Sequence, residues 1–208
     1  MADAPPPASS PLRQLRIVLW VAVAIAVALY ALLMLRPETL GRPVAEAAAE
    51  PAAAAPFTLT DGQGRQFSSS ALAGKPYALY FGFTRCGDAC PTTLGRMARL
   101  RDQAGGPNAF NLVFITIDPD HDGPAQVGQY ATLFDTPIIG LTGTKAAIAK
   151  VKQNYGIHAG PTPHAGPGME MAHTTTVLLF DAKGQRAGSI SPTDSDAAAL
   201  AALKRLTA

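Results

Sequence analysis

The sequence predicts an α/β domain preceded by a single transmembrane helix, and three observations support this. Strand-like apolar runs alternate with helical patterns over residues 57–208, which is typical of a sheet with a parallel core covered by helices on both sides. The segment Ile17–Leu35 carries no charged residue. A length of 208 residues with 48% hydrophobic content suffices for one domain of ordinary size and an anchor, and a net charge of +2 argues against a nucleic-acid partner. We therefore expect a disordered tail over 1–16, a transmembrane anchor over 17–35, a Pro/Ala-rich linker over 36–56 and the folded domain over 57–208.

The charge-free segment is long enough to cross a bilayer as a helix. At about 1.5 Å per residue it spans roughly 28 Å, close to the thickness of the hydrocarbon core. A cleaved signal peptide is the alternative, because small residues follow Arg42, but its apolar stretch would be shorter. We expect an uncleaved anchor. Arg13 and Arg16 before the segment balance Arg36 and Arg42 after it, so charge alone leaves the orientation undecided.

Gly, Pro and Asp residues divide the domain into expected elements. Phe57 to Ser68 alternates around Asp61-Gly62, as in a β-hairpin. Tyr77–Phe83 is a nearly unbroken apolar run, typical of a strand buried on both faces of a sheet. The further expected elements are a helix from Pro91 to Gly105-Gly106, a strand Asn111–Ile117, a helix from near Pro124, a strand Ile138–Leu141, a helix Thr144–Tyr155, strands Thr174–Phe180 and Ala187–Ile190, and a helix Asp194–Leu206 capped by Asp194.

The only two cysteines, Cys86 and Cys90, lie between the strand Tyr77–Phe83 and the next helix. Pro91 suits the first position of that helix, because its missing N–H would have no partner there. Backbone N–H groups and the helix dipole favour thiolate over thiol at such a place. Three residues separate the cysteines, where thioredoxin-type redox turns have two, and this spacing lets both sulfurs hold one ion. Two thiolates and one histidine would suit Cu(I), whereas structural zinc takes four ligands. A disulfide or two inert buried thiols is the alternative.

Histidines gather in and just after the Gly- and Pro-rich segment Gly156–Ala172. A long segment of this kind in a compact domain is usually functional or disordered. His173 is the candidate third ligand, because it stands at the mouth of the strand Thr174–Phe180, which can hold it near the cysteines. We interpret His158 and His164 as loop residues.

Three methionines carry sulfur that could also bind copper. Met169 and Met171 are candidates for receiving or handing over Cu(I), and packing of the loop is the alternative. Met97 has helical spacing with Leu94 and Leu100, which predicts a core residue.

Three acidic residues, Asp118, Asp120 and Asp122, follow the next predicted strand together with His121. Their spacing lacks the glycine of a calcium loop, so we interpret them as a solvated loop that caps the helix near Pro124. Asp118 is the exception. It ends a strand expected to lie next to the cysteine-bearing one, so we expect it beside the metal ligands without being one.

Several separated motifs, in order from about Phe57 to the C-terminus, resemble those of the Sco/SenC family of copper-handling, thioredoxin-like proteins. The matching stretches are Gly74-Lys75-Pro76, Tyr80-Phe81-Gly82-Phe83-Thr84, Cys86, Asp88, Cys90-Pro91-Thr92-Thr93-Leu94, Ile117-Asp118-Pro119, Gly140-Leu141-Thr142-Gly143-Thr144, His173-Thr174 and Leu179-Phe180-Asp181. The chain departs from the family pattern at Arg85, Gly87 and Ala89, and at Ala172, where the family usually has an acidic residue.

The resemblance implies a thioredoxin-like fold and a copper ion bound by Cys86, Cys90 and His173. Copper would be held as Cu(I), with Cu(II) left open. The family's role implies copper delivery to the binuclear centre of cytochrome c oxidase subunit II, with an upstream copper donor as a second partner. It also implies a bacterial inner-membrane protein with one membrane pass and its C-terminal domain in the periplasm. We therefore expect a chaperone rather than an enzyme.

Two other functions use the same sulfurs. A thiol–disulfide oxidoreductase would reduce the cysteines of the copper acceptor, with one sulfur attacking and the other resolving. Thioredoxins carry a cis-proline before the strand that faces their cysteines, whereas His173-Thr174 is expected there, which argues against a general oxidoreductase. A peroxidase-like or copper-sensing role is weaker and would need Arg85 to lower the pKa of a cysteine.

Overall fold

The computed structural model describes residues 11–34, 53–161 and 171–208. These fall into two units, residues 1–49 and residues 50–208. The described part of the first unit is one helix, α1 (Pro11–Met34). It begins before Ile17, where the sequence predicts the span, because Pro11 suits a first helical position and the residues after it are good helix formers. Residues 1–10 of the expected tail lie outside the described residues.

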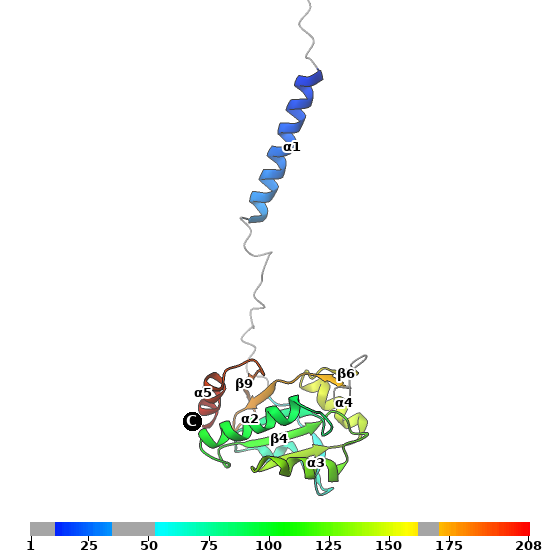
Figure 1. The fold of residues 1–208 in the computed structure, drawn as a ribbon, viewed down its shortest axis with the longest axis vertical. Helices are drawn as coiled ribbons and strands as arrows, with labels where there is room; N and C mark the ends of the chain where they lie inside the picture. The colour runs from blue at the N-terminus through cyan, green and yellow to red at the C-terminus, as the bar shows by residue number, and fades with distance from the viewer. Residues whose placement is uncertain (1–10, 35–52, 162–170) are drawn as a thin grey trace, which may run out of the picture. The chain divides into compact units, whose positions relative to one another are not determined.

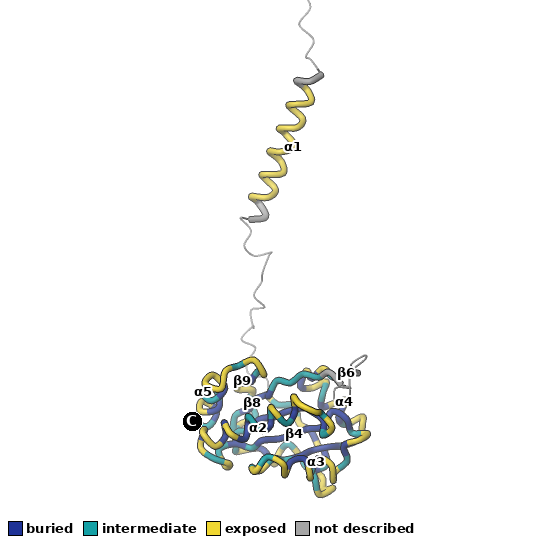
Figure 2. The backbone as a smooth tube through the Cα atoms, in the orientation of Figure 1, coloured by how far each residue is buried: buried dark blue, intermediate teal, exposed yellow. Residues whose placement is uncertain are grey.

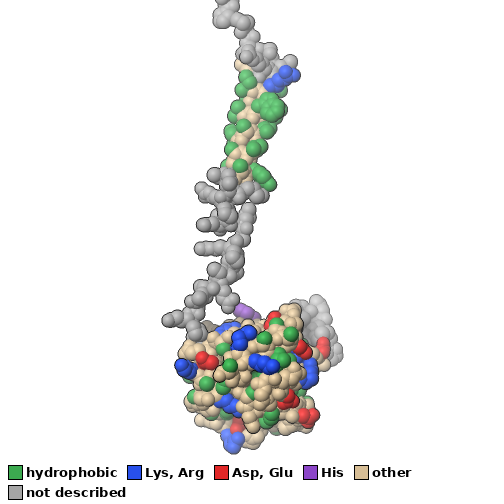
Figure 3. All heavy atoms as spheres, turned by 90° about the vertical axis from the view of Figure 1, so that its left-hand side faces the viewer, with side chains coloured by type: hydrophobic (Ala, Val, Ile, Leu, Met, Phe, Trp, Pro, Cys, Tyr) green, Lys and Arg blue, Asp and Glu red, His purple; other side chains and the backbone are tan. Residues whose placement is uncertain are grey.

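Helix α1 has the length and composition of a membrane span. The stretch Gln14–Ala31 is both long enough and apolar enough to cross a bilayer, and all its side chains are exposed. Figure 3 shows apolar side chains along this helix, with a basic side chain near one end. A signal sequence near the N-terminus meets the same criteria, so both interpretations of this segment stay open.

The second unit is an α/β domain (Figure 1). Its elements are β1 (Thr58–Asp61), β2 (Gln66–Ser68), the 3₁₀ turn η1 (Ser69–Leu72), β3 (Tyr77–Gly82), α2 (Ala89–Gln103), β4 (Asn111–Thr116), α3 (Pro124–Ala131), η2 (Thr132–Phe134), β5 (Ile138–Thr142), α4 (Lys145–Asn154), β6 (Ala159–Pro161), β7 (Met171–His173), β8 (Val177–Phe180), β9 (Arg186–Ile190) and α5 (Asp196–Thr207).

Seven strands form one mixed sheet in the order β2-β1-β5-β4-β3-β8-β9. The central strands β5, β4 and β3 are parallel, and the outer pairs are antiparallel. The predicted N-terminal hairpin is confirmed: β1 pairs with β2, and the Asp61 carboxylate accepts the backbone N–H groups of Gln63 and Arg65 within the turn. The parallel core predicted from the alternation of strands and helices is also confirmed.

Two apolar cores lie on opposite faces of this sheet. Alternate residues of β3 point to opposite faces, because side chains alternate along a strand. Ala78 and Tyr80 pack with α2, α3 and α5, whereas Leu79 and Phe81 pack toward α4. Figure 2 shows the sheet as the buried layer between helices whose outer sides are exposed. The strand that leads to the cysteines is therefore held on both sides.

The structure differs from the sequence prediction at both ends of the domain. Ala53 forms a β-bridge with Gln185, and the Ala54 N–H donates to the Gly184 carbonyl at 2.8 Å, so residues predicted to be linker join the domain. Ser195, and not Asp194, caps α5 and accepts the Ala198 N–H. Asp194 is already engaged, because its carboxylate accepts the Ser191 N–H at 2.7 Å.

Candidate metal centre

The two cysteines lie where β3 passes into α2. Cys86 is in the connecting turn, and Cys90 is in the first turn of α2. The sequence predicts Pro91 at the first position of this helix. Helix α2 begins at Ala89, so Pro91 occupies its third position instead. Proline fits there as well, because the N–H groups of the first turn have no partner within the helix. Both cysteines are free thiols.

A buried carboxylate that sequence reasoning missed holds the cysteine turn. Asp122 is 0% exposed, and its carboxylate accepts hydrogen bonds from the Thr84 N–H at 2.9 Å, the Thr84 hydroxyl at 2.5 Å and the Thr116 hydroxyl at 2.6 Å. The prediction of a solvated, helix-capping loop is therefore wrong for Asp122, and Gly123 stands at the start of α3 without a side-chain cap. A signal was present in the sequence: Thr84 and Thr116 both follow buried apolar runs and need polar partners.

His173 lies at the end of β7, a strand of a separate two-stranded sheet in which it pairs with Ala159. It does not lie at the mouth of β8, because residues 174–176 separate the two strands. Its Nδ1 lies 3.0 Å from the Thr174 carbonyl oxygen. A carbonyl only accepts, so Nδ1 carries the proton and donates it, which leaves the lone pair of Nε2 toward Cys90. The Thr174 carbonyl thus orients the imidazole. Ala172, which precedes His173 in the sequence, has no polar side-chain group that could do so.

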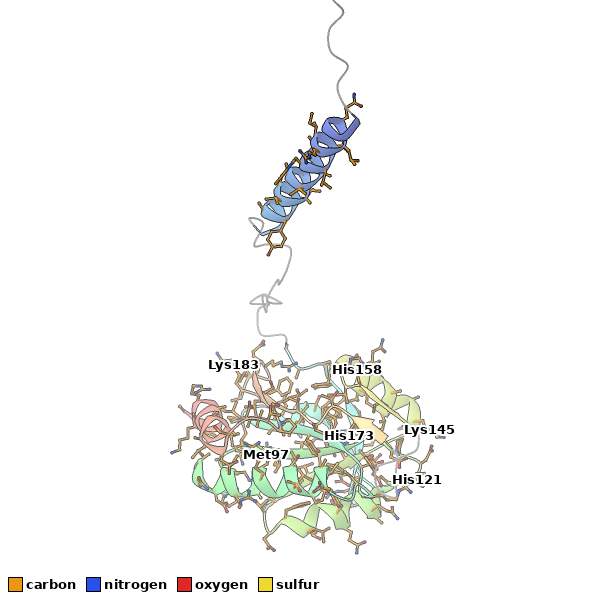
Figure 4. All side chains as sticks on the ribbon, turned by 45° about the horizontal axis from the view of Figure 1, so that its top comes forward. Met97, His121, Lys145, His158, His173 and Lys183 are labelled. Carbon is orange, nitrogen blue, oxygen red and sulfur yellow. The ribbon has the colours of Figure 1, made fainter. Side chains whose placement is uncertain are left out.

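Three potential ligand atoms meet in this region. The two cysteine Sγ atoms and a ring nitrogen of His173 all lie within 4.8 Å of one another, and Cys90 Sγ is 3.5 Å from His173 Nε2. Among the described residues this is the cluster of metal-ligand side chains that forms, and the acidic loop does not contribute to it. Figure 4 places His173 among the side chains of the domain interior and His121 near its outer edge.

Two aromatic rings pack against the imidazole. The rings of Phe83 and Tyr80 meet the His173 ring edge-on, with centroids 5.8 Å and 6.3 Å away. Burial lowers the pKa of His173, and the hydrogen bond to Thr174 only partly opposes this. A neutral imidazole is the form that binds a metal ion.

The two cysteines differ in exposure. Cys90 is 0% exposed, whereas Cys86 is half-buried. Burial raises the pKa of the Cys90 thiol to about 12, and the Tyr80 hydroxyl acts in the opposite direction. The sequence alone suggested that the helix N-terminus favours a thiolate here. For Cys90 the cost of desolvating the charge outweighs the effect of the helix N-terminus, so the thiol form is favoured. The Cys90 N–H donates to Cys86 Sγ at 3.4 Å.

Gly82 makes room for the inner sulfur. A Cβ atom at this position would lie 2.8 Å from Cys90 Sγ, closer than such atoms approach in real structures. Any larger residue would clash with this sulfur unless Cys90 or β3 moved. The absence of a side chain at Gly82 thus sets the position of Cys90.

Asp118 lies near the cysteine turn but is engaged with other groups. Its carboxylate accepts Arg85 Nη2 at 2.9 Å and pairs with His121 Nδ1 at 3.0 Å. Burial acts to raise the pKa of Asp118, but the hydrogen bonds from His121 and Arg85 outweigh it and keep the pKa below its ordinary value. Asp118 therefore contacts Arg85, which precedes Cys86, and does not belong to the cluster of potential metal ligands.

The remaining methionines and histidines considered as copper ligands do not join the cluster where the structure describes their side chains. Met97 is 1% exposed and packs with Leu94 and Leu100, so its prediction as a core residue is confirmed. The His158 side chain is exposed, and its backbone pairs with Thr174. His164 and Met169 lie outside the described residues, as does the side chain of Met171.

Comparison with known proteins places the chain in a family. The SCO1/SenC family model matches residues 45–208. The chain is 32% identical over 140 residues to the mitochondrial protein SCO1 of Saccharomyces cerevisiae, covering 65% of this chain and 48% of that protein. It is 34% identical over 134 residues to a putative copper-binding protein of Stutzerimonas stutzeri, covering 64% of this chain and 66% of that protein. The chain thus spans about half to two thirds of the length of these relatives.

Solved structures show the same fold. The copper-bound ScoI of Bradyrhizobium japonicum superposes with a TM-score of 0.65 at 35% identity, covering 74% of this chain and 99% of that one. The copper-bound ScoI of Arabidopsis thaliana gives a TM-score of 0.68 at 26% identity, covering 74% and 97%. Both likenesses cover the α/β domain that brings together Cys86, Cys90 and His173. The chain is therefore a member of the SCO1/SenC family, with the thioredoxin-like fold that its motifs imply.

Proposed function

We propose that this chain is a membrane-anchored copper-binding protein that carries one copper ion on Cys86, Cys90 and His173. The observation that carries the proposal is the cluster of the three ligand atoms within 4.8 Å. Two soft sulfurs and one neutral imidazole nitrogen are a donor set that suits copper, and similar structures hold it. We expect Cu(I) as the main form.

The residues prepare this site in different ways. The Thr174 carbonyl fixes the tautomer of His173, so that Nε2 is available as a ligand. Gly82 and the bonds of Asp122 hold the cysteine turn in place. Cys90 must release its proton when it binds copper, because only the thiolate is a strong ligand.

We further propose that the cargo goes to the binuclear copper centre of cytochrome c oxidase subunit II, in keeping with the family's role in oxidase assembly. Thiolates of the acceptor would displace the three ligands one at a time. An upstream donor would load the site by the reverse exchange. No turnover is needed, so the chain acts as a chaperone.

The proposed location is the bacterial inner membrane, with the domain in the periplasm. Helix α1 supports one membrane pass. The mass of the mature chain tests this, because an uncleaved anchor retains residues 11–34. Protease added to spheroplasts should then digest the domain, whereas an intact domain would place it in the cytoplasm.

Metal analysis of the full chain in detergent tests the copper site. We expect one copper ion per wild-type chain, and a loss of at least about 100-fold in Cu(I) affinity for His173→Ala. His158→Ala is the matched control, because this exposed histidine lies outside the cluster and should bind copper normally. Equal affinities of the wild type and His173→Ala would contradict the site.

A thiol–disulfide reductase is the second candidate, supported by the unequal exposure of the two sulfurs. A half-buried Cys86 could attack a disulfide, and the buried Cys90 could resolve the mixed disulfide. His173→Ala separates the functions, because it should abolish tight copper binding and leave most of the reductase activity. If reductase activity depends on Cys86 while wild-type protein takes up no copper, the second candidate replaces the first.

A further inference from the structure

A buried tyrosine hydroxyl in the core next to the inner sulfur has no hydrogen-bond partner in the described part of the chain. Tyr80 is 0% exposed and lies in β3, two residues before Gly82 and on the same face of the sheet. Among the described residues, no group bonds its hydroxyl with normal geometry. Its polar neighbours are Cys90 and Thr93. Buried hydroxyl groups almost always have a partner, so this one needs a physical reason.

The ring of Tyr80 borders two of the three clustered groups. A Cβ atom at Gly82 would touch both Cys90 Sγ, at 2.8 Å, and Tyr80 Cε1, at 3.2 Å, so sulfur and ring lie around the same point. The ring also meets His173 edge-on. The Tyr80 ring therefore lies beside the sulfur, and its hydroxyl is shielded from water.

We propose that Tyr80 is a positioning residue whose hydroxyl donates a hydrogen bond to the Cys90 sulfur when that sulfur binds copper as a thiolate. This inference rests on the proposed copper site. A thiol sulfur is a weak acceptor, so the hydroxyl gains little from Cys90 before copper binds. A thiolate is a charged acceptor and makes a much stronger hydrogen bond. The orphaned hydroxyl of the copper-free chain is thus matched to the charge that appears on loading.

The effect of this bond is to stabilise the sulfur ligand in its bound form. Hydrogen bonds to a copper-binding sulfur withdraw charge from it and tune the properties of the metal. This bond would give Cys90 a hydrogen-bond donor, as the Cys90 N–H already provides one for Cys86. It also favours retention of the cargo until an acceptor replaces this ligand.

The experiment compares Tyr80→Phe with a matched control. The change removes only the hydroxyl and keeps the ring that packs against His173. Tyr130→Phe is the control, because the Tyr130 hydroxyl is also buried and finds no partner among the residues that the structure describes. Its ring packs on Phe114 in the same core, with centroids 5.1 Å apart. Tyr130 has only a longer-range electrostatic influence from the cysteines.

Cu(I) affinity is measured on the full chain by competition with a chromophoric chelator, and the sulfur-to-copper band is recorded with Cu(II). For Tyr80→Phe we expect about a tenfold loss of affinity and a shift of the band to longer wavelength. Tyr130→Phe should match the wild type in both. A merely structural role would not move the band.

Three results would overturn the inference. Tyr80→Phe could match the wild type, or Tyr130→Phe could change as much as Tyr80→Phe. Alternatively, Tyr80→Phe could lower the melting temperature of the copper-free chain, which would mean that the hydroxyl already has a structural partner. If the wild type itself binds no copper, the proposed function fails. If the wild type binds copper and Tyr80→Phe matches it, only this inference fails.

Discussion

The two halves of the candidate site are held in different ways. The cysteines lie between β3 and α2, and both elements pack into the core of the seven-stranded sheet. His173 ends a strand of a separate two-stranded sheet with three paired positions. A two-stranded sheet is only marginally stable by itself. The comparison indicates that the sulfurs have the firmer support in the fold, whereas the imidazole rests on a weaker one.

Amide exchange should show the largest contrast between the two halves. We expect the amides of β6 and β7 to exchange at least about 100-fold faster than those of β3, because local opening of the small sheet exposes them without unfolding the core. Hydrogen–deuterium exchange of the copper-free chain measures this. Equal protection of the β3 and β7 amides from exchange would contradict the difference in support between the two halves of the site.

Asp122→Ala should weaken the cysteine half most. It leaves Thr84 and Thr116 without their buried acceptor, so we expect a loss of about 3 kcal/mol in the free energy of unfolding, measured with urea. Asp120→Ala is the control. Asp120 is 52% exposed and pairs with an exposed Lys145, so its loss should cost about 0.5 kcal/mol or less. Similar losses for both variants would refute the role of Asp122.

Gly82→Ala should act directly on the inner sulfur. The added Cβ would also lie 3.1 Å from Phe114 Cε2, so overpacking should cost about 2 kcal/mol and weaken copper binding. Gly87→Ala in the same turn is the control, because a Cβ there meets nothing within 4 Å. Unfolding curves and chelator competition check both variants. Wild-type copper affinity in Gly82→Ala would mean that the sulfur can move without consequence.

The ion pair beside the cysteine turn should give the smallest effect, visible in acid. The pKa of Asp118 is lower in the folded chain than its ordinary 3.8. The stability that it contributes is therefore fully present above that value and is lost as the pH falls through the folded pKa. Asp118→Asn should flatten the loss of stability as the pH falls below about 4. An unchanged slope in this variant would assign the acid sensitivity to other carboxylates.

Much of the fold could be predicted from the sequence, because its central strands are apolar runs that end at Gly, Pro or Asp. Tyr77–Phe83 and the hairpin at Asp61-Gly62 are examples in which local pattern and tertiary burial agree. The three clustered residues were accessible through the spacing of Cys86 and Cys90 and the family resemblance. Their meeting in space required the fold.

The supports of the site could not be predicted in the same way. An acidic residue in a loop is normally solvated, and the burial of Asp122 depends on Thr84 and Thr116, which come together only because β3 and β4 pair. The orienting group of His173 is a backbone carbonyl, which carries no sequence signal. The pKa of Cys90 depends on a burial that competes with the helix N-terminus, and sequence alone cannot weigh the two.

The unequal depth of the two sulfurs gives any exchange at this centre a fixed order. An approaching protein thiol meets Cys86 first, because Cys90 is covered by β3 and the aromatic side chains around it. Cys90 would then be replaced as a ligand only after the incoming thiol has already bound the metal ion. Under the proposed function, copper would therefore pass directly to the acceptor protein without release into the surrounding water.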